Sequence, residues 1–261
     1  MDMQNGVAIV TGSSSGVGAA CARQFAELGA HVVINYSRNE DGALATQAAC
    51  EALGAETLVI KADVSDDDQC KSLAAAAEER WGRIDALVNN AGTTKFVPHT
   101  DLDGLTRDDF LRVYAVNTVG PYMMTRAVVP AMQRGQRGSI VNVSSIAGVM
   151  GVGSSIAYAA SKGALNTMTL SLARALGPHI RVNTICPGFI QGDWLRDGLG
   201  DEAYEVSKRR VEETSPLRVA SSPDDIAAGV LYFITGADVI TGETLIMDGG
   251  SHLATAGLTK R

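Results

Sequence analysis

Dense runs of basic residues are absent from this chain, which carries 22 lysines and arginines against 29 aspartates and glutamates, a formal charge of −7. Surfaces that bind nucleic acid need clustered basic residues, so we expect no nucleic-acid partner. Long apolar runs are absent too, since no uncharged apolar stretch approaches the ~18 residues that a membrane-spanning helix needs. We therefore expect no segment that spans a membrane.

Cysteines and targeting signals are equally sparse. The four cysteines have no close cysteine or histidine neighbours in the sequence, which argues against a zinc site and against a disulfide framework. The first residues, MDMQNGVAIVTG, lack the basic start and the long apolar stretch of a signal peptide. We predict no metal site, a cytoplasmic location, and reduced, buried thiols at Cys21, Cys50, Cys70 and Cys186.

Short apolar, β-branched runs recur along the chain and alternate with longer, alanine-rich segments of helical periodicity. This alternation predicts βαβ units, and runs that are apolar throughout are typical of parallel strands covered on both faces. We predict a single α/β domain over residues 1–261, a doubly wound Rossmann-type parallel sheet with helices on both faces. About seven strands are expected, at residues 7–11, 31–36, 57–61, 86–89, 139–143, 181–185 and 244–247.

A glycine-rich turn, TGSSSGVG at residues 11–18, follows the first predicted strand and precedes a helical segment. Glycines let the backbone approach a diphosphate, and the amides at a helix N-terminus favour negative charge. The spacing of Gly12, Gly16 and Gly18 differs from the GxGxxG fingerprint, and the lysine of a P-loop is missing. We interpret the turn as a dinucleotide site; a simple tight connection is the alternative.

The end of the second predicted strand bears on which dinucleotide binds. An acid there would bind the ribose 2′-hydroxyl of NAD, but the chain has no acid before Glu40. Ser37 can donate a hydrogen bond to a 2′-phosphate, and Arg38 can pair with it. The sequence therefore favours NADP(H); NAD(H) stays an alternative, because Arg38 can equally be a solvated loop charge.

The segment AYAASKGAL contains Tyr158 and Lys162, whose spacing of four places both side chains on one face of a helix. Reduction of a carbonyl by hydride requires a proton for the oxygen, and Tyr158 can supply it. We expect the Lys162 ammonium, together with the positive charge of the oxidised cofactor, to lower the pKa of this tyrosine.

With these motifs, NNAG at 89–92, CPGFI at 186–190 and ITGETLIMDGG at 240–250, the sequence resembles the short-chain dehydrogenase/reductase family nearly from end to end. It looks most like the 3-oxoacyl-[acyl-carrier-protein] reductases. The resemblance implies four catalytic residues: Tyr158, Lys162, Ser145, which would polarise the carbonyl, and Asn117, whose backbone carbonyl would hold a water linked to Lys162. Ser144 competes with Ser145 for its role, although the spacing to Tyr158 favours Ser145.

The resemblance also implies a set of cofactor contacts, made by the glycine-rich turn, the ends of the following strands and the catalytic helix. They are Gly12, Ser14, Ser15, Gly16, Val17 and Gly18 at the pyrophosphate, Asp63 and Val64 at the adenine, Asn90, Ala91 and Gly92 beside the ribose, Tyr158 and Lys162, and Pro187, Gly188 and Ile190 at the nicotinamide, besides Ser37 and Arg38. One departure is Gly192, where the family commonly has a threonine, so that a hydroxyl contact to the cofactor is lost.

The sequence says less about the substrate. Residues 191–222 are polar and irregular, and the resemblance implies that they fold over the substrate as a lid. Trp194, Leu195 and Leu199 can make an apolar wall there; an exposed face of a mobile helix is the alternative. An acyl carrier protein is a further candidate partner, because an acidic carrier would need a basic patch at the site mouth, for which the chain offers Arg134, Arg137 and Arg174.

Three functions stay open at this stage. The first is an NADPH-dependent reductase of 3-oxoacyl thioesters, carried by acyl carrier protein or coenzyme A. The second is a dehydrogenase of sugars, polyols or other small secondary alcohols, and the third is a dinucleotide-binding regulator without turnover. We also predict a homotetramer, because one long helix carries apolar residues on more than one face: Met123, Met124, Val128, Val129 and Met132.

Overall fold

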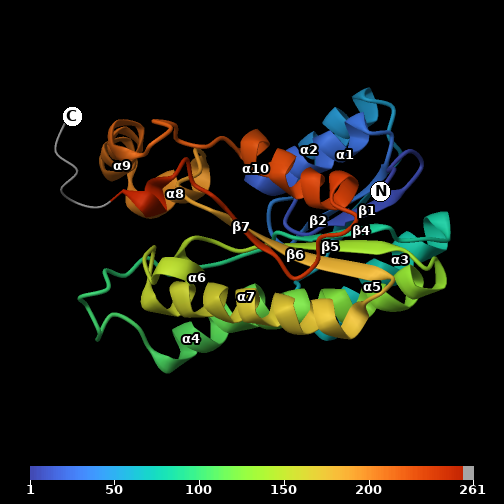
Figure 1. Cartoon of the computed structure of the whole chain (residues 1–261), viewed down its shortest axis with the longest axis horizontal. Coiled ribbons are helices and arrows are strands. Elements are labelled where there is room, and N and C mark those ends of the chain that lie inside the picture. The colour runs from blue at the N-terminus through green and yellow to red at the C-terminus, as the bar shows by residue number, and fades with distance from the viewer. Residues whose placement is uncertain (255–261) are drawn as a thin grey trace.

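The computed structural model describes residues 1–254 and confirms the predicted architecture (Figure 1). Seven parallel strands form one sheet in the order β3-β2-β1-β4-β5-β6-β7. The order reverses direction between β1 and β4, the switch point at which doubly wound sheets open a crevice for ligands. The strands are β1 Val7–Val10, β2 His31–Tyr36, β3 Thr57–Lys61, β4 Ala86–Asn89, β5 Gly138–Val143, β6 Ile180–Pro187 and β7 Thr244–Met247.

Helices cover both faces of the sheet, because each parallel crossover must return over one face. Figure 1 shows α1, α2 and α10 on one side and α3, α4, α5 and α7 on the other. The helices are α1 Gly16–Glu27, α2 Glu40–Ala52, α3 Asp67–Trp81, α4 Arg107–Tyr114, α5 Gly120–Arg134, α6 Ala147–Met150, α7 Ile156–Leu176, α8 Asp193–Leu199, α9 Asp201–Thr214 and α10 Pro223–Leu231, with π-helical turns η1 Ala115–Val119 and η2 Tyr232–Gly236 and the 3-10 turn η3 Ser251–Leu253.

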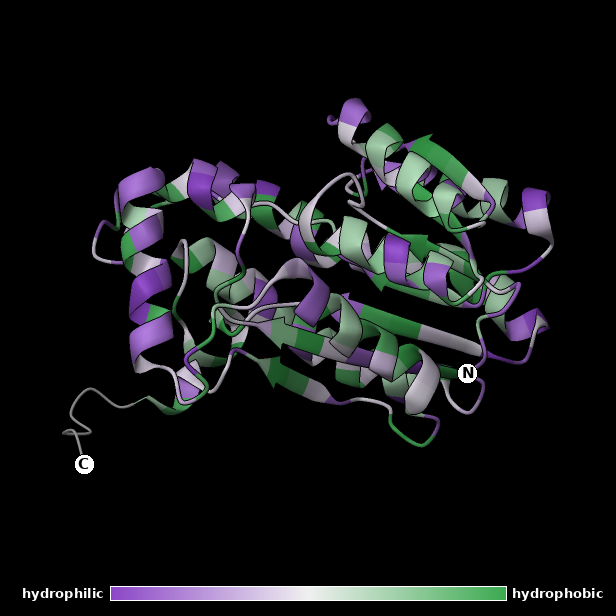
Figure 2. Ribbon diagram, turned by 90° about the horizontal axis from the view of Figure 1, so that it is seen from above, coloured by the Kyte–Doolittle hydropathy of each residue, from purple (hydrophilic) through white to green (hydrophobic). Residues whose placement is uncertain are grey.

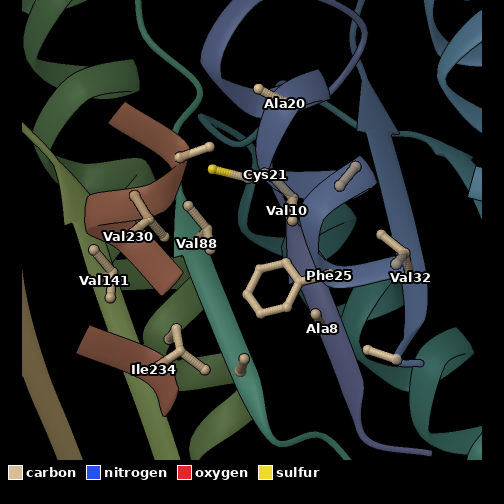
Figure 3. Close-up of a cluster of buried hydrophobic side chains, with 14 of the residues drawn as sticks. Ala8, Val10, Ala20, Cys21, Phe25, Val32, Val88, Val141, Val230 and Ile234 are labelled. Atoms are coloured by element: carbon tan, nitrogen blue, oxygen red, sulfur yellow. The ribbon is translucent and has the colours of Figure 1, made fainter. Parts of the chain in front are cut away.

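Two apolar clusters hold these layers together, one on each face of the sheet. Because side chains alternate along a strand, Ala8 and Val10 of β1 join the first cluster, while Val7 and Ile9 join the second. The first cluster lies between the sheet and α1, α2 and α10, with Phe25 at its centre (Figure 3). Apolar packing against both faces explains why the strands are apolar throughout.

Two of the helices, α4 and α10, begin with a capping box. Thr106 accepts a hydrogen bond from the amide of Asp109, whose carboxylate accepts one from the amide of Thr106, a complete capping box. The same reciprocal pair joins Ser222 and Asp225 before α10, with Pro223 in its first turn.

The apolar residues of α5 need a different explanation from the one that the sequence suggests. Met123, Met124, Val128 and Met132 are buried within the chain itself, against the second cluster, and Val129 alone of the five is partly exposed. The argument from these residues to a subunit interface is therefore wrong. The homotetramer stays a prediction, and an interface would have to use other exposed apolar side chains of this layer, such as Tyr122 and Leu170.

The predicted lid is more regular than expected, because α8 and α9 occupy most of residues 191–222. The sequence did not predict α9, because the exposed faces of this helix are rich in charged residues, as Figure 2 shows at the left. Tyr204 is its one buried residue. Among residues 1–254, no helix is both long and apolar enough to cross a membrane.

Phe25 offers a direct test of the first cluster. Replacing this fully buried ring by alanine should lower the free energy of unfolding by roughly 3–5 kcal/mol, because it removes apolar contacts and leaves a cavity. The matched control is Leu28→Ala at the end of the same helix, where the side chain is exposed and the change should stay within about 0.5 kcal/mol. Chemical denaturation measures both, and equal losses would contradict the assignment of Phe25 to the core.

Candidate functional site

A cavity of about 1060 Å³ opens at the carboxyl ends of the strands, next to the switch point between β1 and β4. Residues from the glycine-rich turn, the strand ends, α7 and the 187–199 segment line it. All the site residues expected from the sequence lie on its wall except Gly18 and Asn117, which lie behind it. The fold thus brings together residues as remote in the sequence as Gly12 and Ile190.

The glycine-rich turn needs its glycines for conformation and for space. Gly12 and Gly16 have φ angles of +62° and +52°, in the left-handed region that favours glycine. A Cβ on Gly12 would lie 2.9 Å from the Cα of Ala91, and one on Gly18 would overlap the carbonyl oxygen of Gly12. Gly16 borders open space, so the turn presents bare backbone to the cavity.

Two asparagines fix this turn against the neighbouring strands. The amide of Gly12 donates to Oδ1 of Asn35 (3.0 Å), whose Nδ2 donates to the carbonyl oxygen of Ala62 (3.0 Å). Nδ2 of Asn90 donates to the carbonyl oxygens of Thr11 and Gly12 at 2.9 and 3.0 Å. The sequence analysis missed this role of Asn35, although a polar residue in an apolar strand was the available signal.

The far end of the cavity is lined by Ser37, Arg38 and Asp63, all of them exposed. One carboxylate oxygen of Asp63 accepts hydrogen bonds from the amide and hydroxyl of Ser65, which holds the side chain at the cavity edge. Glu40 is not part of the wall, so Asp63 is the acid that stands with Arg38 at this end of the cavity.

The cavity fits a nicotinamide dinucleotide. It is long, its middle is a bare glycine turn at the N-terminus of α1, and it ends beside a tyrosine and a lysine. No group of three or more His, Cys, Asp or Glu side chains within residues 1–254 has the arrangement to hold a metal ion.

Lys162 is the most constrained of the candidate catalytic residues. Its side chain is 3% exposed, and its Nζ donates a hydrogen bond of 2.8 Å to the carbonyl oxygen of Val143 at the end of β5. The same Nζ lies 5.7 Å from the centre of the Tyr158 ring, as their spacing on α7 requires. A Cβ on Gly92 would lie 3.8 Å from this Nζ, so the 90–92 segment passes directly over the lysine.

Burial sets the charge states of this pair. It raises the pKa of Tyr158 to about 12, although the neighbouring Ser145 hydroxyl acts in the opposite direction, and it lowers the pKa of Lys162 to about 8. In the protein alone desolvation dominates the pKa of Tyr158, and the lowering expected from Lys162 together with the oxidised cofactor stays a prediction. Tyr158 is protonated at neutral pH and Lys162 is mostly charged.

The two serines after β5 have different environments. The Ser144 hydroxyl is buried and donates to the backbone carbonyl oxygen of Lys162 (3.1 Å). The Ser145 hydroxyl is partly exposed, accepts from the amide of Ala147 (3.1 Å), and lies beside the Tyr158 hydroxyl. Its own proton therefore stays available to a carbonyl in the cavity.

Asn117 lies within the π-helical turn η1 and is fully buried. Its side chain accepts from the amide of Thr93 (2.8 Å) and donates to the carbonyl oxygen of Thr93 (2.9 Å) and to the Ser161 hydroxyl (3.0 Å). These bonds tie the segment after β4 to α7, next to Lys162. A π-helical turn interrupts the regular helical bonding and is frequent at functional sites.

Aromatic side chains surround the tyrosine. The ring of Trp194 in α8 lies 5.9 Å from that of Tyr158 and 5.7 Å from that of Phe96, measured between centroids. Leu195 and Leu199, expected beside Trp194, also line the cavity, as does Val152. The sequence analysis missed Phe96, because nothing in its neighbourhood marks it as part of the site.

Several polar side chains at this end of the cavity are already paired. The hydroxyls of Thr94 and Ser154 share a hydrogen bond of 2.7 Å, Arg112 donates to the Thr93 hydroxyl (3.3 Å), and Gln191 donates to the carbonyl oxygen of Ala220 (2.8 Å). The surroundings of Tyr158 are therefore mainly apolar.

Two expectations about neighbouring residues need correction or comment. Gly192, in place of the family's threonine, has a φ of +145°, and its amide donates to the buried Tyr204 hydroxyl (3.2 Å), which anchors the segment. The prediction of a basic patch at the cavity mouth is wrong. Arg137 precedes the start of β5 and Arg174 lies in the last turn of α7, so both lie at the opposite end of the sheet. Arg134 forms an ion pair with Glu78.

Comparison with known proteins bears on this site. A family model described as enoyl-(acyl carrier protein) reductase matches residues 11–252. The chain is 40% identical over 247 residues (95% of this chain, 96% of the relative) to a protein assigned as ketoacyl reductase 2 of the granaticin polyketide synthase of Streptomyces violaceoruber. It is 36% identical over 248 residues (94% and 95%) to an L-rhamnose 1-dehydrogenase (NAD(P)(+)) of a Sphingomonas species.

A solved structure gives the same result. A Burkholderia xenovorans protein assigned as a short-chain dehydrogenase/reductase superimposes with a TM-score of 0.89 and 43% sequence identity, covering 95% of this chain and 98% of that one. The chain therefore belongs to the short-chain dehydrogenase/reductase family of oxidoreductases, as its motifs predict.

Proposed function

We propose that this protein is an NADPH-dependent reductase that converts the ketone of a 3-oxoacyl thioester to a secondary alcohol. The observation that carries the proposal is a protonated tyrosine, Tyr158, in a cavity that fits a dinucleotide and beside an apolar, aromatic wall. The thioester carrier, coenzyme A or an acyl carrier protein, is not part of the proposal, because the three arginines considered for docking lie away from the mouth.

The reaction divides between the cofactor and the chain. When bound, the reduced dinucleotide supplies the hydride that adds to the carbonyl carbon. The Ser145 hydroxyl donates a hydrogen bond to the carbonyl oxygen, which favours the negative charge that develops there. Tyr158 donates its phenolic proton to that oxygen, so a C–H and an O–H bond form as the carbonyl π bond is lost.

Lys162 and Asn117 support this step without contacting the substrate. The charged ammonium of Lys162 stabilises the phenolate left on Tyr158, and Asn117 positions the 90–94 segment and α7 around it. The backbone carbonyl of Asn117 is the group that would hold a water through which Lys162 exchanges protons with solvent. A pKa of about 12 makes Tyr158 a proton donor at neutral pH, which suits reduction.

The choice of substrate rests on the character of the wall. A sugar or polyol, the substrate class of the rhamnose dehydrogenase, needs several free polar partners, and the hydroxyls of Thr93, Thr94 and Ser154 are already paired. Phe96, Trp194 and Leu199 instead suit an acyl chain, in agreement with the name of the granaticin relative. A non-catalytic regulator would have no use for a protonated tyrosine beside a buried lysine.

The preference for NADPH rests on the opposite end of the cavity. Ser37 and Arg38 line it, Glu40 does not, and the carboxylate of Asp63 at this end accepts hydrogen bonds from Ser65. A guanidinium recognises a phosphate by charge-assisted hydrogen bonds, whereas a carboxylate would repel it.

The reaction is tested by cofactor absorbance with 3-oxobutanoyl and 3-oxohexanoyl thioesters at neutral pH. NADPH should be consumed, and Tyr158→Phe should lower kcat by roughly 10²- to 10⁴-fold while the Kd for NADPH stays near that of the wild type, because only the proton donor is removed. Full activity of Tyr158→Phe would refute its role. No consumption by the wild type, combined with oxidation of a sugar or polyol, would refute the proposed substrate.

The pH profile tests the charge of Lys162. Its pKa of about 8 means that the ammonium is present below that pH and is lost above it, whereas Tyr158 stays protonated to much higher pH. The kcat/KM for NADPH, which reports groups of the free enzyme, should therefore fall above pH 8. A profile that stays flat to pH 10 would show that the ammonium is not required.

Arg38→Ala tests the 2′-phosphate contact. The KM for NADPH should rise roughly tenfold, the lower end for a hydrogen bond to a charged group, while the KM for NADH changes little. Arg107→Ala, which removes an exposed arginine outside the cavity wall, is the matched control and should leave both values unchanged. Equal losses for both cofactors would remove the argument for NADPH.

A further inference from the structure

The segment α8 is joined to the rest of the site at a few defined points. Gly192 before it and Gly200 after it have φ angles of +145° and +79°, conformations that other residues rarely adopt. The helix itself contributes Trp194, Leu195 and Leu199 to the cavity wall. Between the two glycines α8 forms a short rigid unit facing Tyr158.

One further glycine fixes how closely this unit approaches the opposite wall. A Cβ on Gly198 would overlap the ring carbons of Phe96, so the backbone of α8 lies directly on the face of that ring. Phe96 belongs to the segment after β4, on the other side of the site, and its ring also contacts Trp194. The contact between Gly198 and Phe96 therefore sets the position of Trp194 over the cavity.

Trp194 stays 48% exposed although it contacts two aromatic rings. Its exposed area adjoins the cavity near Tyr158, so a substrate whose carbonyl reaches the Tyr158 hydroxyl must carry its substituent past this ring. Burying an apolar chain against the indole removes water from both surfaces, which is favourable in proportion to the area buried.

We propose that Trp194, held in place by the contact of Gly198 with Phe96, is a specificity-determining residue that selects substrates by the length of the apolar chain beyond the reacting ketone. The inference rests on the function proposed above and deepens it: the preferred substrates carry an acyl chain of several methylenes rather than the shortest one. Each added methylene that lies on the wall strengthens binding by about three- to fourfold.

The test uses the enzyme loaded with NADP⁺ and a series of non-reducible probes, the N-acetylcysteamine thioesters of butanoic, hexanoic and octanoic acid. Titration calorimetry should show the Kd of the wild type falling about three- to fourfold per methylene. In Trp194→Ala the fall should shrink to less than about twofold per methylene, because the indole surface on which the chain lies is removed. Gly198→Ala should flatten the series in the same way although Trp194 is still present, because the new methyl group displaces α8 from Phe96.

Trp81→Phe is the matched control. Trp81 is the other tryptophan of the chain, stacks on His31 at 5.4 Å and lies outside the cavity wall, so its replacement should leave the series as in the wild type. In this variant Trp194 is the sole tryptophan, and its emission should change saturably as the octanoyl probe binds.

The outcomes separate this inference from the proposed function. A wild-type series without dependence on chain length, or one that Trp194→Ala leaves unchanged, overturns the role of Trp194 even if 3-oxoacyl thioesters are reduced. A steep series that Trp194→Ala flattens supports the wall even if none of the corresponding 3-oxoacyl thioesters is reduced, in which case the proposed reaction fails by itself.

Discussion

The hydrogen bond from Lys162 to the carbonyl oxygen of Val143 is the interaction on which the site depends. It fixes the first turns of α7 against the end of β5, and Ser144 adds a second bond between the same two elements. Ser145 and Tyr158 then lie side by side, because Ser145 follows β5 by two residues and Tyr158 lies in the first turn of α7. These bonds set the position of the helix relative to the sheet at the cavity.

The same burial that holds Lys162 also sets the chemistry. An ammonium with no carboxylate partner is costly to bury, which is why its pKa falls to about 8, and a phenol in the same surroundings keeps its proton. The protein alone thus prepares an acid and not a base. A positive charge on the oxidised cofactor would act in the opposite direction, so the two directions of the reaction meet different electrostatic conditions at Tyr158.

The cavity combines a general part with a particular one. The glycine turn, Asn90 and Lys162 line the part of the cavity that fits a dinucleotide, a cofactor that many enzymes share. Their hydrogen bonds are mostly to backbone atoms, which are present in every sequence. The wall of Phe96, Trp194 and Leu199 comes from the loop after β4 and from α8, where side chains are constrained little by the sheet. This division agrees with relatives whose names indicate substrates as different as a ketoacyl group and L-rhamnose.

The sequence by itself determined the sheet, since seven apolar runs that alternate with helical segments indicate parallel strands covered on both faces, and it predicted most of the residues that line the half of the cavity proposed for the dinucleotide. These site residues could be predicted because the glycine turn and the spacing of Tyr158 and Lys162 are local patterns in the sequence. Tertiary structure alone decided the charge states of Tyr158 and Lys162, because desolvation depends on every surrounding element and not on the spacing of the pair.

Tertiary structure also decided three matters on which the sequence misled or was silent. The apolar face of α5 is covered by the chain itself. Arg134, Arg137 and Arg174 lie at the end of the sheet opposite to the cavity, and Phe96 contacts Trp194 across the site. Each is a contact or a distance between segments remote in sequence. Periodicity and motifs report the neighbours of a residue within one element, and they carry no information about which element packs against it.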